Sequence, residues 1–167
     1  MSKQIDAFLK EMEHEANTTR KMLSRIPDDK FDYKPHPKSM PISRLSAHIA
    51  EIPGWVDMAL TTNELDFANP ASYNRFEAHS QKELIPYFEK KLEEGKAALK
   101  KATDDQLDEK WTMRNGDKIL AVNTVGETIR MAYCQIVHHR AQLGVFLRLL
   151  DVPIPGSYGP SADETGF

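Results

Sequence analysis

The chain of 167 residues has 40% hydrophobic and 28% charged residues, which is typical of one globular domain, expected here over residues 1–167. Its formal net charge of −3 and the lack of a basic block argue against strong sequence-independent binding of nucleic acid, and it contains no apolar run long enough to span a bilayer. The first residues lack the apolar stretch of a signal peptide and the one cysteine, Cys134, cannot form an internal disulfide, so we expect a cytoplasmic protein.

The first half of the chain contains two predicted amphipathic helices. The first covers residues 3–26, and its apolar side chains recur at the three- and four-residue spacing of one helix face. Pro27 disfavours helix in the residue before it, so we expect this helix to end there. The second covers residues 41–61 and contains Pro53, whose ring removes one backbone hydrogen bond and predicts a kink.

Two capping boxes in the second half predict where two further helices begin. In the stretches Ser80–Glu83 and Thr124–Glu127, the first and fourth side chains can each satisfy a free backbone N–H of the other residue. Between these helices, Asn115–Asp117 contains a central glycine and predicts a turn that joins two short extended pieces. Residues 63–79 show no periodicity and predict a loop or short turns.

Four amphipathic helices with no convincing long strand predict an all-α fold. The expected arrangement is a four-helix bundle with irregular connectors, because each helix has one apolar face to bury against the others. Residues 154–167 follow the fourth helix and form a tail rich in proline and glycine.

Two histidines lie on the apolar faces of predicted helices, His48 on the second and His139 on the fourth. A buried imidazole needs hydrogen-bond partners or a metal ion, so the two are either core histidines bonded to protein oxygens or ligands of one ion. Gln135 precedes His139 by one helical turn and can point to the same place. His48, Gln135 and His139 are therefore a candidate metal site with open positions for water, as in catalytic sites. The neutral amide of Gln135 predicts weaker binding than three histidines.

Three residues near this candidate site can each be interpreted in two ways. His138 lies about 100° around the helix from His139, so a place beside the site or on a dimer surface fits it better than ligation. Arg140 either orients an anionic group or forms a salt bridge. Cys134 and His138 are one turn apart, which is compatible with a cysteine nucleophile, whereas a lone cysteine with apolar neighbours is typical of an inert core residue.

Three stretches resemble the DinB family: residues 38–51, 138–143 and 158–164. The resemblance covers essentially the whole chain and implies a four-helix bundle, usually dimeric. It also implies a divalent metal ion, typically nickel, zinc or iron, held by three histidines. Two of these match His48 and His139, and the family arginine matches Arg140, but Gln135 stands where the family has its third histidine.

The resemblance implies a metal-dependent enzyme that is either a small-thiol S-transferase, as in bacillithiol- and mycothiol-dependent members, or a hydrolase. The expected partners are a small-molecule substrate and a second copy of the chain, with no membrane and no nucleic acid. The alternative is a non-catalytic dimeric bundle with a decayed metal site, which binds a small molecule or a protein in a stress response. Gln135 favours this alternative, and neither hypothesis assigns a catalytic residue.

Overall fold

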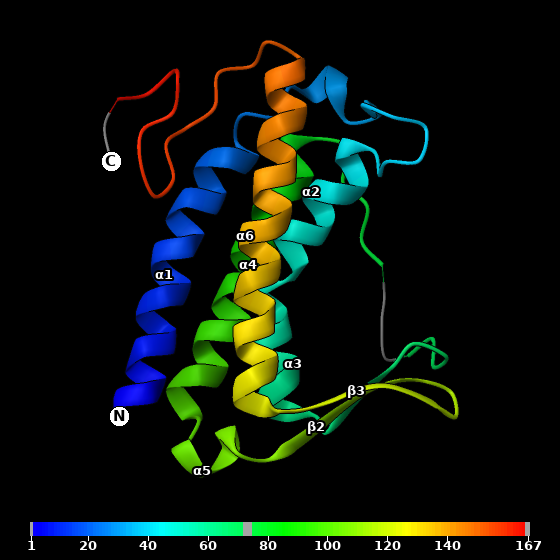
Figure 1. Ribbon diagram of the computed structural model, residues 1–167, viewed down its shortest axis with the longest axis vertical. Helices are drawn as coiled ribbons and strands as arrows, with labels where there is room; N and C mark the ends of the chain where they lie inside the picture. Colours follow the sequence, from blue (N-terminus) through cyan, green and yellow to red (C-terminus); the bar gives the residue numbers. More distant parts are fainter. Residues whose placement is uncertain (1, 72–74, 166–167) are drawn as a thin grey trace.

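The computed structural model describes residues 2–71 and 75–165, so part of the predicted loop and the last two residues of the predicted tail lie outside the described residues. The elements follow along the chain as α1 (Lys3–Leu23), the short 3-10 helix η1 (Asp28–Lys30), α2 (Ile42–Glu51), α3 (Pro53–Thr61), β1 (Glu64–Asp66), α4 (Gln81–Lys101), α5 (Asp104–Leu107), β2 (Lys110–Asn115), β3 (Lys118–Thr124) and α6 (Val125–Leu149). Figure 1 shows α1, α4 and α6 alongside one another, with α2 and α3 stacked end to end as the fourth rod.

The predicted four-helix bundle is confirmed, including the kink at Pro53. The helical backbone continues through Ile52 from α2 into α3, and Pro53 takes the first position of α3. The first helix is shorter than predicted and ends at Leu23, because the N–H of Ile26 bonds the carbonyl of Leu23 in a tighter turn before Pro27. At the start of α6 both hydrogen bonds of the predicted capping box are present.

The core lies between the helices and is built from their apolar stripes. Its largest fully buried side chains come mainly from α1, α2, α4 and α6 and from the root of the sheet, and they include Ile5, Met12, Leu23, Leu45, Ile49, Leu84, Phe88, Trp111 and Tyr133. Across residues 2–71 and 75–165, no helix is both long and apolar enough to cross a membrane.

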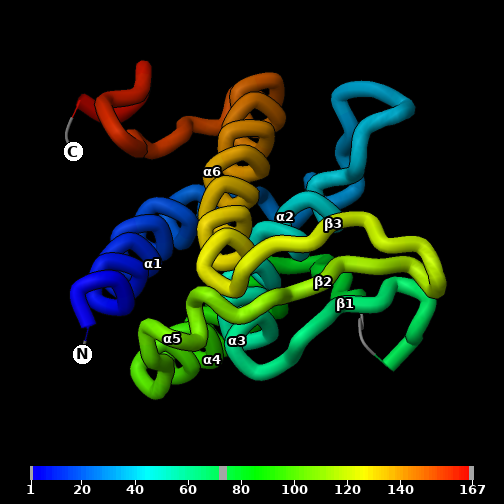
Figure 2. Tube along the Cα trace, turned by 60° about the horizontal axis from the view of Figure 1, so that its bottom comes forward, coloured from blue at the N-terminus to red at the C-terminus, as the bar shows by residue number. Residues whose placement is uncertain are grey.

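The prediction of an all-α fold is wrong, because the described residues include a three-stranded sheet in the order β1-β2-β3. Strands β2 and β3 form the expected antiparallel hairpin, with Gly116 in the turn at φ 59°. Strand β1, inside the predicted loop, pairs in parallel with β2, and Glu64 lies opposite Thr112. The three residues of β1 are too few to show the alternation of apolar and polar side chains that predicts a strand, and their hydrogen-bond partners lie in a distant segment, β2. Figure 2 shows the three strands side by side, projecting to one side of the helices.

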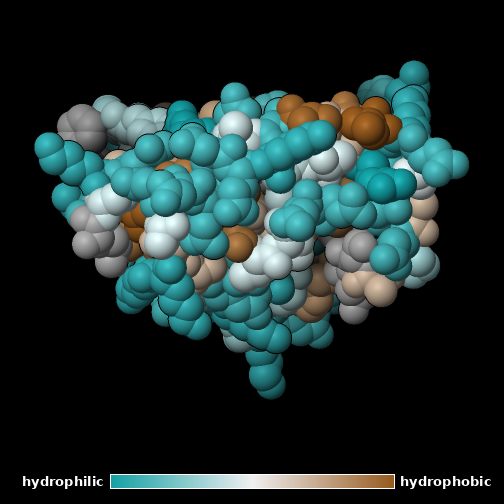
Figure 3. All heavy atoms as spheres, turned by 90° about the horizontal axis from the view of Figure 1, so that it is seen from below, coloured by the Kyte–Doolittle hydropathy of each residue, from teal (hydrophilic) through white to brown (hydrophobic). Residues whose placement is uncertain are grey.

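The hairpin leaves apolar side chains in solvent. Ile119 is 62% exposed, Leu120 46% and Val122 47%. The pairing of β2 with β3 is irregular between Met113 and Arg114, where Leu120 is the extra residue, and such a bulge hinders pairing of an edge strand with another chain. In Figure 3 this end of the molecule is mostly hydrophilic, and hydrophobic atoms gather along the edge on the side of β3.

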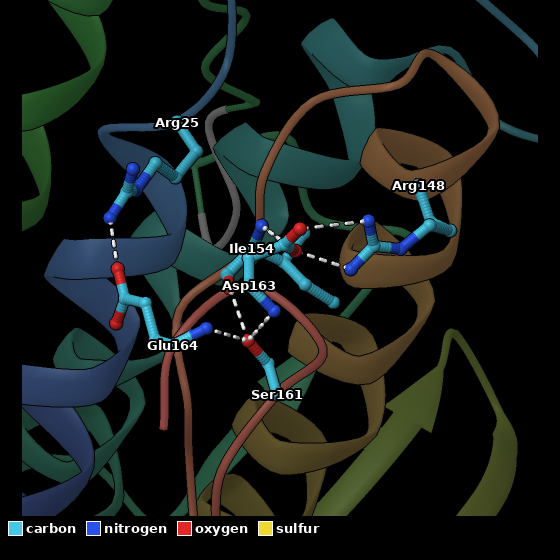
Figure 4. Close-up of polar contacts among 6 residues, drawn as sticks. All are labelled: Arg25, Arg148, Ile154, Ser161, Asp163 and Glu164. Carbon is cyan, nitrogen blue, oxygen red and sulfur yellow. Dashed lines mark hydrogen bonds and ion pairs between the residues drawn. The ribbon is translucent and has the colours of Figure 1, made fainter. Parts of the chain in front are cut away.

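The tail after α6 is held by side chains instead of by regular structure (Figure 4). Ser161 donates from Oγ to the carbonyl of Ile154 at 2.7 Å and accepts from the N–H of Asp163 and of Glu164, both at 3.0 Å. Asp163 pairs with Arg148 of α6, and Glu164 pairs with Arg25 at the end of α1. One of the three family-like stretches therefore fixes the tail against α1 and α6.

Gly95 marks the close approach of α4 to the Pro53 kink. A Cβ atom there would lie 2.4 Å from the carbonyl oxygen of Pro53 and 3.0 Å from the methyl carbon of Met12. We expect Gly95→Ala to lower the free energy of unfolding by about 1–3 kcal/mol despite alanine's better helix propensity, since overpacking outweighs that gain. Thermal denaturation measures the change, and Gly159→Ala, with no atom within 4 Å of its new Cβ, is the control. Equal melting temperatures for the two variants would contradict the packing argument.

Candidate metal centre

His48 of α2 and His139 of α6 lie side by side although they are far apart in sequence. Their ring centroids are 4.6 Å apart and their planes are inclined by 72°. The His48 side chain is 14% exposed and its ring also meets the edge of Trp55, at 5.5 Å. The two imidazoles are thus close enough together for both to reach one ion.

Each of the two rings is held by a hydrogen bond at Nδ1. The Oε1 atom of Glu51 lies 2.6 Å from Nδ1 of His48, and the Oε1 atom of Gln142 lies 3.0 Å from Nδ1 of His139. Because these oxygens accept, the proton of each neutral ring lies on Nδ1 and the lone pair on Nε2. An outer partner of this kind fixes the ring orientation and tautomer of a metal-binding histidine.

Burial lowers the pKa of His139 below its ordinary value. The hydrogen bond that His139 donates to Oε1 of Gln142 opposes this shift, whereas the nearby His48, His138 and Arg44 favour the neutral ring and lower the pKa further. His139 is therefore neutral at neutral pH, which is the form of imidazole that binds a metal ion.

The sequence patterns did not identify Glu51, Gln142 or Arg44 as part of the site, although the structure places all three around the histidines. Nη1 of Arg44 lies 3.9 Å from Oε1 of Glu51, and the Arg44 side chain is 16% exposed. A usable signal is present in the chain, because an oxygen acceptor follows each histidine at the same spacing of three residues, Glu51 after His48 and Gln142 after His139.

Three further candidate residues on α6 differ in exposure: Gln135, His138 and Cys134. Gln135 is half-buried one turn before His139. Among residues 2–71 and 75–165, no three His, Cys, Asp or Glu side chains form a group that could hold a metal ion, so a third protein ligand beside His48 and His139 would be of another residue type, such as Gln135. His138 is exposed, and its Nε2 atom lies 3.2 Å from Nε2 of Gln142. Cys134 is exposed as well, so the interpretation as a core residue is wrong: the inward positions of this part of α6 are taken by Ala132, Tyr133 and Ile136.

Arg140 points to α1 and the tail, where it forms the salt bridge that the sequence left open. Its side chain is 3% exposed, and Nη1 donates to Oε2 of Glu15 at 2.7 Å and to Oγ1 of Thr19 at 3.1 Å. Nη2 donates to the hydroxyl of Tyr158 at 3.0 Å, and that hydroxyl donates to Oε1 of Glu15 at 2.6 Å. These contacts join α6 to α1 and do not reach the histidine pair.

A sequence profile of the DinB family matches residues 1–165. The chain belongs to the DinB family. Among curated proteins, the uncharacterized protein YrdA of Bacillus subtilis (strain 168) is 26% identical over 171 residues, which cover 98% of this chain and 93% of YrdA. The resemblance of the three stretches to the DinB family is thereby confirmed.

Solved structures share the fold of this DinB-family chain. YfiT from Bacillus subtilis, described as a probable metal-dependent hydrolase with an unusual four-helix bundle topology, matches with a TM-score of 0.69 and 13% identity over 92% of this chain and 91% of YfiT. A mycothiol-dependent maleylpyruvate isomerase matches with a TM-score of 0.58 and 14% identity over 86% of this chain and 64% of the isomerase. At these identities the likeness shows a common helical bundle.

Proposed function

We propose that this DinB-family protein is a metal-dependent enzyme with its ion held by Nε2 of His48, Nε2 of His139 and the amide oxygen of Gln135. The observation that carries the proposal is that the two rings are adjacent and both Nδ1 atoms are already bonded, by Glu51 and Gln142. A bound nickel, zinc or iron ion would lower the pKa of a coordinated water or thiol. The neutral amide of Gln135 makes this a weak site.

The reaction we propose is transfer of a low-molecular-weight thiol to an electrophile, or hydrolysis at the same centre. Support comes from the names of two proteins of like fold, one called a probable metal-dependent hydrolase and the other mycothiol-dependent. In either reaction Glu51 and Gln142 would keep the rings of His48 and His139 oriented. A homodimer, a cytoplasmic location and a role in a stress response stay predictions.

A second candidate function is a non-catalytic bundle with a decayed metal site that binds a small molecule or a protein. It is favoured by Gln135 and by the lack, within the described part of the chain, of any group of three His, Cys, Asp or Glu ligands. In that case Glu51 and Gln142 would serve only to satisfy two partly buried imidazoles.

Metal content, measured by mass spectrometry on protein purified without an affinity tag, separates the two functions. We expect near-stoichiometric metal in the wild type and loss of metal in both His48→Ala and His139→Ala, because each removes one of few ligands. His36→Ala, in the connector before α2, is the control and should keep the metal. A wild type that is metal-free and cannot be reloaded with nickel, zinc or iron would leave the non-catalytic bundle as the better account.

A further inference from the structure

A hollow lies between α6 and the connector before α2, residues 31–41. Figure 1 shows α6 at the front of the bundle, with this connector on one side of its C-terminal half. The hollow has a volume of about 390 Å³, which is within the range of pockets that bind small molecules. It is here called the Lys38 pocket, and it is lined by Lys38, Ser39, Met40, Leu45, Gln142, Val145 and Phe146.

Four of the side chains that line the Lys38 pocket are apolar. Leu45 is fully buried and Phe146 is half-buried, so these two belong to its inner wall. Met40 on the connector is 37% exposed and Val145 on α6 is 59% exposed. Apolar surface in contact with water is unfavourable, and a ligand with an apolar body would cover it.

The polar side chains of the pocket carry one positive charge. None of the described residues that line it is acidic, and Lys38 forms no ion pair with any residue that the structure describes. The backbone here is fixed by a turn, because the N–H of Lys38 donates to Nδ1 of His36 at 3.1 Å and the N–H of Ser39 donates to the carbonyl of His36 at 2.9 Å. One ammonium and one hydroxyl beside an apolar wall are complementary to a single carboxylate on an apolar body.

We propose that the Lys38 pocket binds a small amphipathic carboxylic acid. The apolar body would pack on Leu45 and Phe146 between Met40 and Val145, and the carboxylate would accept from the ammonium of Lys38. Because Lys38 is exposed, its ion pair contributes little and the apolar body supplies most of the affinity. For an acid of this size we expect a dissociation constant on the order of 1 mM.

A bound acid would also act on the metal centre, a consequence that rests on the proposed function. Gln142 lines the pocket, and its Oε1 atom accepts from Nδ1 of His139. An apolar body in the pocket would exclude water from Gln142 and preserve this hydrogen bond, so we expect tighter metal binding. Loss of such an outer partner weakens metal binding by about 10- to 100-fold, which is the upper limit for the effect. By linkage, nickel should raise the affinity for the acid by the same factor.

The test compares phenylpropanoate with phenylpropanol, which has the same apolar body without the charge. Chemical-shift changes in NMR titrations measure both dissociation constants and locate the ligand. We expect the wild type to bind the acid about 2- to 5-fold more tightly than the alcohol, and Lys38→Met to bind both equally, because an exposed ion pair contributes that much. Val145→Glu adds a carboxylate beside the pocket and should weaken binding of the acid. Ile119→Glu, at an equally exposed apolar residue on β3, is the control.

Four results would overturn the proposal. Equal affinity of the wild type for the acid and the alcohol would show that the carboxylate is not recognised. No binding of the acid at several times the expected dissociation constant would exclude the pocket as its site. An unchanged affinity in Val145→Glu would place the ligand elsewhere. A wild-type dimer that Val145→Glu dissociates, measured by light scattering, would show that a second copy covers the pocket.

Nickel titration with and without phenylpropanoate separates this proposal from the proposed function. Tighter nickel binding in the presence of the acid, lost in Val145→Glu, supports both the pocket and its effect on the metal centre. Equal nickel affinity with and without the acid would keep the pocket and overturn the coupling through Gln142. A wild type that binds the acid but no nickel would overturn the proposed function and leave the pocket standing.

Discussion

Replacing Gln135 with histidine is expected to raise the affinity for nickel or zinc by at least about 10- to 100-fold. Loss of a hydrogen-bond partner outside the ligand set already changes metal affinity by about 10- to 100-fold. Gln135→His acts within the ligand set, because it exchanges a neutral amide oxygen for an imidazole nitrogen. The backbone need not move, because position 135 lies one turn before His139 on the same helix. Competition with a chelator of known affinity measures the dissociation constant.

A double variant shows whether the new histidine acts together with His48. In Gln135→His combined with His48→Ala, two histidines remain as in the wild type, so the gain should disappear. If Gln135→His leaves the affinity unchanged, the pocket has been remodelled and the three-ligand geometry is wrong. A gain that persists in the double variant would place the metal on α6 alone, away from α2.

Replacing Arg140 with methionine is expected to lower the free energy of unfolding by about 3–5 kcal/mol. The change removes the cation that pairs with Glu15, which is 5% exposed, and leaves that buried carboxylate with the hydrogen bond from the hydroxyl of Tyr158. For a chain of this length, the melting temperature should fall by on the order of 10 °C. Denaturant unfolding and thermal denaturation both measure the effect.

The matched control is Arg148→Met, the same change in the same helix. Arg148 also pairs with a carboxylate, Asp163, but its side chain is 43% exposed, so the loss should be small. A second variant, Arg140→Met with Glu15→Met, should recover part of the stability, because the buried charge is removed with its partner. Equal losses for Arg140→Met and Arg148→Met would show that burial of the ion pair does not determine its contribution.

Local patterns predict the helices of this chain well because the interactions that define them are local. Capping boxes, proline positions and apolar spacing act over a few residues, and they locate the starts of α4 and α6 and the kink at Pro53. Strand β1 escapes such patterns, since its hydrogen bonds come from β2, which lies more than forty residues away along the chain.

The candidate site divides in the same way. Helical spacing places His48 and His139 on apolar faces, and bundle packing then brings such faces together. The direction of the Arg140 side chain depends on neighbours from other elements. The hydrogen-bond partners of Nδ1 in His48 and His139 likewise depend on side-chain directions. Arg140 is next to His139 in sequence, yet one residue along a helix is about 100° of rotation, and this turns it to Glu15 on α1.

The amino-acid sequence by itself determined that this protein is a helical bundle with two inward-facing histidines, since periodicity and capping are properties of short segments. Only the tertiary structure decided that the rings lie 4.6 Å apart, that Glu51 and Gln142 hold them, and that a small sheet projects from the bundle. These features depend on contacts between distant segments, which no local pattern encodes.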